Sequence, residues 1–192
     1  PGHSSAASDV YKRQEQQKNE TMMKIPKISI DLNFDWLKKA KLVELKDIDI
    51  SSDPVRPDLP ISWRINHGRK MFGLYYGKDL MAVMCFAYTN EVPKTLYELD
   101  KLSEVAHLES VHRVGQQGKI AVAYTVWSLK KGGGRMIVNE VHKMIKESSH
   151  LTRLVTLSPL TQMAEKFHLR NGAKLLQKNL WSQNFELSLI HI

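Results

Sequence analysis

The residues 119–135 (KIAVAYTVWSLKKGGGR) set the architecture, because a run of β-forming residues passes directly into a basic, glycine-rich turn. Lys119–Leu129 is rich in β-branched and aromatic side chains and predicts a central strand. After the turn, Ile137, Val141 and Met144 recur at helical spacing. This order predicts a ligand loop at a helix N-terminus, where free backbone N–H groups bind phosphate.

The turn contains residue types that suit an anionic ligand. Glycine lets a ligand approach the backbone closely, and lysine and arginine add positive charge. The sequence has neither a Walker pattern nor a dinucleotide fingerprint, and three successive glycines also fit a flexible turn that binds nothing. The predicted phosphate-binding residues are Lys130, Lys131, Gly132, Gly133, Gly134 and Arg135.

Upstream of the central strand, the pattern predicts two helices and a hairpin. Met71–Tyr76 and Leu80–Thr89 are apolar and aromatic runs separated by a short glycine-containing turn, as in a β-hairpin. Pro93–Leu102 has leucines three residues apart and predicts a helix. Phe34–Leu45 alternates apolar residues with lysine and predicts a short amphipathic helix with a basic face.

Downstream, the elements complete a mixed α/β arrangement. Arg153–Leu157 predicts a short buried strand, and Lys174–Trp181 predicts a last strand. Between them, Ser158-Pro159 has the cap and first-position residues of a helix start. Asn171-Gly172 has the residue types that end a helix. The expected fold class is therefore α/β (α+β), with a mixed sheet flanked by helices.

The composition narrows the class of protein. The 192 residues are 42% hydrophobic and 25% charged with a net charge of +8, as in a globular protein with one principal domain. A single cysteine, Cys85, excludes an internal disulfide and makes a reducing compartment such as the cytoplasm the expectation. We expect no membrane span, no metal site, and no nucleic-acid partner, because the basic residues are scattered. The positive charge serves solubility or a small anionic partner.

The two ends of the chain differ from the rest. Pro1–Gln14 and Leu187–Ile192 resemble translated adapter sequence, and the first twenty residues have no helical or strand period. We predict a disordered or non-native leader over 1–21, a single domain over 22–186 and a non-native tail over 187–192.

The order of elements resembles the Gcn5-related acetyltransferase superfamily. In that superfamily, a Gln/Arg-x-x-Gly-x-Gly/Ala loop after the fourth strand holds the pyrophosphate of coenzyme A. Gly132 and Gly134 match its glycines, while Leu129 stands where Gln or Arg is expected. His168, four residues before Gly172, matches the position of a tyrosine that protonates the leaving thiolate in many acetyltransferases.

Two short motifs resemble the C-terminal catalytic domain of malonyl-CoA decarboxylase. They are TLSP at Thr156–Pro159 and FHLRNGA at Phe167–Ala173, and the resemblance extends over about 71–179. It implies that Ser158 and His168 are catalytic. It also implies decarboxylation of malonyl-CoA to acetyl-CoA and CO₂, with no cofactor beyond the coenzyme A of the substrate. The expected partner is an acyl-CoA or acyl-carrier-protein thioester, and the oligomeric state stays open.

The sequence departs from that family between the two catalytic positions. The family has a long insertion there, whereas only ten residues separate Ser158 from His168. On one straight helix they would lie about 15 Å apart, too far for a hydrogen bond. Either the helix starts later, at about Thr161, or Ser158 is only a helix cap.

In the decarboxylase interpretation, the imidazole of His168 protonates carbon, and Ser158 or a backbone N–H stabilises the enolate oxygen. Trp127 lines the pantetheine slot and Asn171 contacts the substrate, although a packing role and a turn role fit these two residues as well. The first alternative is an acyl-CoA-dependent N-acyltransferase with His168 as general acid, although the strand 82–88 has no acidic residue to serve as base. The second is an inactive acyl-thioester-binding module.

Overall fold

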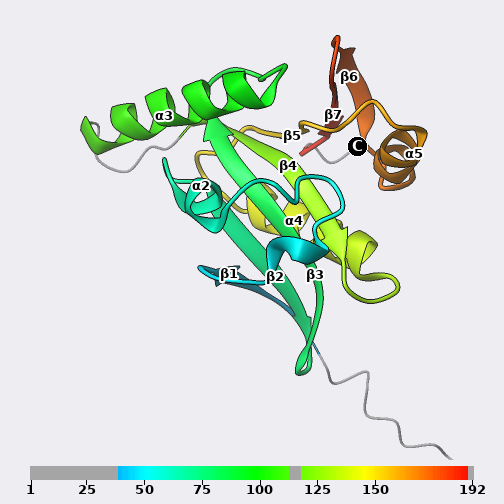
Figure 1. The fold of residues 1–192 in the computed structure, drawn as a ribbon. Coiled ribbons are helices and arrows are strands. Elements are labelled where there is room, and N and C mark those ends of the chain that lie inside the picture. The colour runs from blue at the N-terminus through cyan, green and yellow to red at the C-terminus, as the bar shows by residue number, and fades with distance from the viewer. Residues whose placement is uncertain (1–38, 113–117, 190–192) are drawn as a thin grey trace, which may run out of the picture. The chain divides into compact units, whose positions relative to one another are not determined.

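The computed structural model describes residues 39–112 and 118–189 (Figure 1). All of them belong to one compact unit, Leu37–Ile192. The predicted leader over 1–21 and the first part of the predicted helix, residues 34–38, lie outside the described residues. Within the described part of the chain, no helix is both long and apolar enough to cross a membrane.

One mixed sheet organises the described residues. Its strands are β1 (Ala40–Leu45), β2 (Lys70–Tyr76), β3 (Asp79–Thr89), β4 (Ile120–Ser128), β5 (Arg153–Thr156), β6 (Lys174–Lys178) and β7 (Gln183–Leu187). They lie in the order β1-β2-β3-β4-β5-β7-β6, with β4 at the centre as predicted. Neighbouring strands are antiparallel except β4 and β5, which are parallel.

Helices cover both faces of this sheet. They are η2 (Ile50–Ser52), α2 (Ile61–Ile65), α3 (Leu96–His112), α4 (Gly133–Lys146) and α5 (Gln162–Arg170). In Figure 1, α4 lies behind the sheet, whereas α2 and the segment around η2 lie in front of it. The core follows the alternation of the strands: Ile137 and Val141 of α4 pack on one face, and Leu99 of α3 packs on the other. The predicted mixed sheet flanked by helices is confirmed.

Two expectations about single elements are wrong, and one strand was not predicted. Residues 40–45 form strand β1 and not a helix, because all six pair with the free edge of β2, whose hydrogen bonds outweigh a weak helical pattern. The helix after Thr156 begins at Gln162 and not at Ser158, because the Thr161 side chain caps it by accepting from the Ala164 N–H at 3.2 Å. The segment 183–187, which had no predicted structure, is strand β7.

The neighbouring strands β4 and β5 pair only over their first four residues. Their register runs from Ile120 with Arg153 to Ala123 with Thr156, and the last contact is from the Leu157 N–H to the Ala123 carbonyl at 2.9 Å. On the other side of β4, the register with β3 shifts at Tyr124, as in a β-bulge. Beyond this point β4 and β5 separate, and the gap between them opens into a pocket.

Candidate active site

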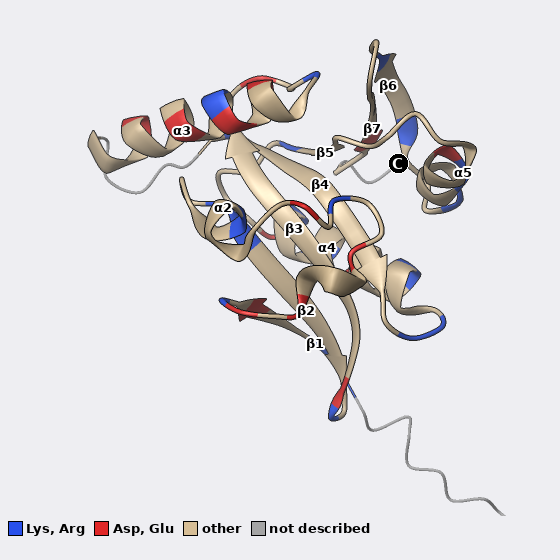
Figure 2. Cartoon of the chain, viewed as in Figure 1, with Lys and Arg blue, Asp and Glu red and all other residues tan. Residues whose placement is uncertain are grey.

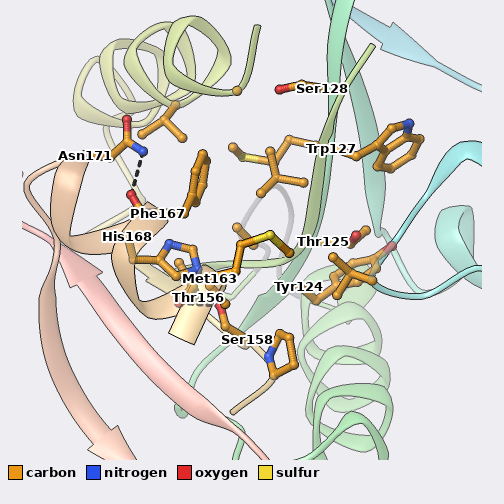
Figure 3. Close-up of a pocket in the computed structure, with 18 of the residues that line it drawn as sticks. Tyr124, Thr125, Trp127, Ser128, Thr156, Ser158, Met163, Phe167, His168 and Asn171 are labelled. Carbon is orange, nitrogen blue, oxygen red and sulfur yellow. Dashed lines mark hydrogen bonds between the residues drawn. The ribbon is translucent and has the colours of Figure 1, made fainter. Parts of the chain in front are cut away.

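The pocket lies where β4 and β5 separate and has a volume of about 400 Å³ (Figure 3). Side chains from β4, the end of β5, α4 and α5 line it, together with Pro54 and Val55 from the segment before α2. Among the described residues, no aspartate, glutamate, lysine or arginine lines this pocket. An apolar pocket with a few polar groups is the usual form of a small-molecule site.

Ser158 and His168 meet at the pocket wall. Ser158 Oγ lies 2.6 Å from His168 Nε2, within hydrogen-bond distance, and both side chains are buried. The late start of α5 makes this possible: the chain turns between Ser158 and Thr161, so His168, in the last turn of α5, lies back beside Ser158. Of the two arrangements that the sequence leaves open, the structure has the later helix start.

Strand β7 holds Ser158 in place. The backbone N–H of Ser158 donates to the Gln183 carbonyl, and the Gln183 N–H donates to the Ser158 carbonyl, both at 2.9 Å. Gln183 Nε2 also donates to the Pro159 carbonyl at 2.9 Å. Ser158 Oγ lies 3.3 Å from Thr156 Oγ1, which accepts from the Phe185 N–H at 3.1 Å. These contacts fix the hydroxyl at the position where it meets the imidazole.

Aromatic packing keeps the His168 ring in an apolar environment. The ring stacks on Phe185 with 4.8 Å between centroids, and Phe167 packs edge-on at 5.3 Å. Burial lowers the pKa of His168 to about 4, because the charged form loses its hydration. The imidazole is therefore neutral at pH 7, with one N–H donor and one acceptor nitrogen.

This pKa predicts how stability depends on pH. The unfolded chain protonates His168 near its ordinary pKa of 6.5, and the folded chain protonates it only near 4. Between these values the unfolded state binds more protons, so the free energy of unfolding decreases as the pH falls from 6.5 to 4. Relative to His168→Gln, we expect the wild type to lose up to about 3 kcal/mol over this window. Urea unfolding of both proteins at several pH values measures it, and parallel curves would contradict the prediction.

The residues of the predicted phosphate loop have different surroundings in the structure. Gly132 precedes α4 with a left-handed φ of 85°, and Gly133 and Gly134 form the first turn of the helix. Gly134 lines the pocket, and Arg135 lines a second hollow between α4 and α5. Lys130 pairs with Asp79 at 2.7 Å, while Lys131 is exposed.

Packing leaves no room for a side chain at Gly133 and little room at Gly134. A Cβ on Gly133 would lie 2.2 Å from the Met81 carbonyl oxygen of β3. A Cβ on Gly134 would lie 2.8 Å from Ser128 Oγ and 3.2 Å from the Phe167 ring. The glycines therefore let the start of α4 approach β3 and α5 closely, which places the free N–H groups of α4 beside the pocket.

The second hollow is basic. Arg135 from α4 and Lys166 and Arg170 from α5 line it, and Figure 2 shows blue segments, which mark Lys and Arg, on α5 and on the turn that leads into α4. Lys166 and Arg170 are not among the phosphate-binding residues predicted from the sequence. Their spacing of four residues places them on one face of a helix, but the facing element is visible only in the fold.

Asn171 lines both the pocket and the basic hollow. Its Nδ2 donates to the Phe167 carbonyl at 2.8 Å (Figure 3), so it caps α5 as the turn interpretation expects. Its Oδ1 is buried and has no hydrogen-bond partner among the described residues. A buried acceptor of this kind is suited to a donor on a ligand.

Trp127 lies on β4 beside the pocket, but its indole is directed away from His168 (Figure 3). Trp127 is 3% exposed and packs in the core cluster on the α3 face. Its Nε1 donates to Ser52 Oγ at 3.1 Å. Trp127 thus borders the pocket through the strand while its ring packs on the opposite face.

Neither a protein-family model nor a curated protein sequence matches the chain. Several solved structures are similar to the chain. It is similar to the GphF GNAT-like decarboxylase in complex with isobutyryl-CoA, at 9% identity over 78% of this chain and 100% of that one, with a TM-score of 0.58. It is similar to the loading GNATL domain of CurA from Lyngbya majuscula, at 13% identity over 79% and 98%, with a TM-score of 0.54. It is also similar to a Bacillus subtilis acetyltransferase in complex with CoA, at 9% identity over 79% and 100%, with a TM-score of 0.51.

These similarities show the fold. The described domain has the Gcn5-related acetyltransferase fold, as the element order predicted. At 9 to 13% identity they do not show which reaction the protein catalyses, because one fold carries many activities.

Proposed function

We propose that the protein decarboxylates a malonyl thioester, converting malonyl-CoA to acetyl-CoA and CO₂. The observation on which this rests is the Ser158–His168 pair, 2.6 Å apart at the wall of an apolar pocket. The similar structures on the same fold include a GNAT-like decarboxylase, which supports the proposal. No cofactor is proposed beyond the coenzyme A of the substrate.

The apolar pocket favours loss of CO₂. A malonyl carboxylate placed there exchanges hydration for apolar side chains, whereas the departing CO₂ is neutral. The C–C bond breaks, and its electron pair moves onto the thioester as an enolate. A hydroxyl donor such as Ser158 Oγ–H then stabilises the enolate oxygen.

The enolate carbon must next take a proton. His168, neutral because burial lowers its pKa to about 4, can donate its N–H proton directly or through Ser158 and recover one from solvent. A thioester enolate is a much stronger base than the imidazole anion, so a neutral donor is sufficient. The pair thereby performs both stabilisation and protonation.

The basic hollow would hold the phosphates of coenzyme A. Arg135 with Lys166 and Arg170 supplies positive charge, and the N-terminus of α4 lies beside it. Asn171 lines both the hollow and the pocket, and its Oδ1, which has no hydrogen-bond partner among the described residues, would accept a pantetheine amide N–H. The thioester would then reach Ser158 through the gap between β4 and β5.

Removing arginines from the basic hollow tests whether it binds the phosphates of coenzyme A. We expect Arg135→Ala combined with Arg170→Ala to weaken coenzyme A binding about a hundredfold or more, since two contacts are lost and each arginine–phosphate contact contributes about 1.5–3 kcal/mol. The loss should shrink at high salt, which screens exposed charges. Calorimetry measures the dissociation constant, and Lys41→Ala, an exposed cation on β1, serves as the control. Equal affinity of the double variant and this control would place the phosphates elsewhere.

A single assay separates the proposed reaction from its alternatives. Purified protein is incubated with malonyl-CoA, first without and then with amine acceptors, while acetyl-CoA, CO₂ and free thiol are measured. Acetyl-CoA and CO₂ without an acceptor support decarboxylation. Free thiol only with an amine indicates an N-acyltransferase, and binding without turnover indicates an inactive module. A malonyl group on an acyl-carrier protein, tested in parallel, identifies the carrier.

A further inference from the structure

One arginine connects β4 and β5 where the two strands separate. The Arg56 guanidinium donates from Nε to the Tyr124 carbonyl at 2.9 Å and from Nη2 to the Leu157 carbonyl at 3.1 Å. The preceding contact between the strands is the backbone hydrogen bond from Leu157 to Ala123. Arg56 thus takes the place of the next backbone contacts and satisfies two carbonyls that the separation would leave without donors.

A buried ion pair holds Arg56 in this position. The Asp53 carboxylate accepts from the N–H groups of Val55 and Arg56, from the Thr125 hydroxyl, and from Arg64 Nη1 at 2.8 Å. The side chains of Asp53 and Arg64 are fully buried. Arg64 Nη2 also donates to the Arg56 carbonyl. The turn that contains Arg56 is therefore held by hydrogen bonds to both its side chains and its backbone.

The same turn forms one wall of the pocket. Pro54 and Val55 line it together with Val138 of α4. The turn lies in front of the sheet in Figure 1, and α4 lies behind it, so the pocket passes through the gap between the strands. The width of that gap limits what can reach Ser158 from the α4 side.

We propose that Arg56 is a positioning residue that holds the gap between β4 and β5 open at the width at which a thioester reaches Ser158. That a thioester passes through the gap rests on the proposed function. That Arg56 holds the gap open rests on its two hydrogen bonds to the carbonyls. Arg56 acts through the backbone, because these two hydrogen bonds go to the carbonyls of Tyr124 and Leu157.

A measurement without ligand tests the gap. In Arg56→Met, water must replace the guanidinium at the two carbonyls, so we expect amide hydrogen exchange over residues 124–128 to rise about tenfold, with a smaller rise in Arg56→Lys. Arg153→Met is the matched control, because Arg153 also connects two strands, through Glu186 at 2.6 Å, but on the β7 side of β5. It should leave exchange over 124–128 unchanged. Unchanged exchange in Arg56→Met would overturn the proposal.

Kinetics test the positioning role. We expect Arg56→Met to lower kcat for malonyl-CoA about tenfold or more while the inhibition constant of coenzyme A, which has no acyl group, changes less than about twofold. Arg56→Lys should recover part of kcat, and Arg153→Met should retain it. Raised exchange with an unchanged kcat would overturn the positioning role. If the wild type makes no acetyl-CoA, the proposed function fails, and the exchange result alone decides whether Arg56 holds the gap.

Discussion

Replacing His168 with alanine is expected to reduce malonyl-CoA decarboxylation by about 10²–10⁴, the usual effect of losing a positioned proton donor. The ring forms one wall of the pocket and the hydrogen bond to Ser158, so the variant loses both the donor and the orientation of the hydroxyl. Release of CO₂ from labelled malonyl-CoA measures the loss. Coenzyme A affinity should change little, because the basic hollow remains intact.

Two further variants show whether the loss of activity is specific to the imidazole of His168. His150→Ala removes an exposed histidine outside the pocket and should retain full activity. His168→Gln keeps a side chain that can bond to Ser158 but cannot act as an imidazole proton donor, and should be nearly as inactive as His168→Ala. Substantial activity in His168→Gln would show that the ring only orients Ser158.

The second large effect is expected from Asn184→Asp in β7. Asn184 is fully buried, and its Nδ2 donates to the carbonyls of Pro93 at 3.0 Å and Thr156 at 2.8 Å. A carboxylate at this position would place a buried negative charge against two carbonyl oxygens. We expect a destabilisation of about 3–5 kcal/mol, comparable to that of an unpaired buried charge. A loss of this size is a large part of the stability of an ordinary domain.

Urea or thermal unfolding measures the loss. Asn66→Asp serves as the control, because Asn66 is exposed and its Oδ1 accepts a backbone N–H, which a carboxylate also does. Unfolding of Asn184→Asp within about 0.5 kcal/mol of the wild type, the range of neutral surface changes, would contradict the assigned contacts.

The elements with a strong local signal were predictable from the sequence. The β-branched run before the glycine turn predicted β4, and the regular apolar spacing after it predicted α4. The cap signal at Ser158-Pro159 and the distance argument for a later start near Thr161 left the start of α5 open, and only tertiary contacts decide between them. Ser158 is engaged with Gln183 on β7, so it is not available as a cap.

The parts of the site that were missed depend on contacts distant in sequence. Gln183 and Asn184 lie in a short polar stretch that has no strand alternation, and their amides are buried only because β7 inserts between β5 and β6. Arg56 lies in a proline-rich segment whose composition indicates only a loop, and it bonds to carbonyls 68 and 101 residues away. Local patterns contain no information on such pairings.

The docking of β7 against Ser158 has a consequence for biosynthesis. Residues 182–185 leave the ribosome after the segments that they organise, so the contacts that hold Ser158 beside His168 are completed only once Gln183 has been synthesised. Until then a nascent chain can build β2, β3 and β4 around α4 and still lack the strand that holds Ser158 beside His168. Any fragment that stops before Gln183 should therefore be inert even where it is folded.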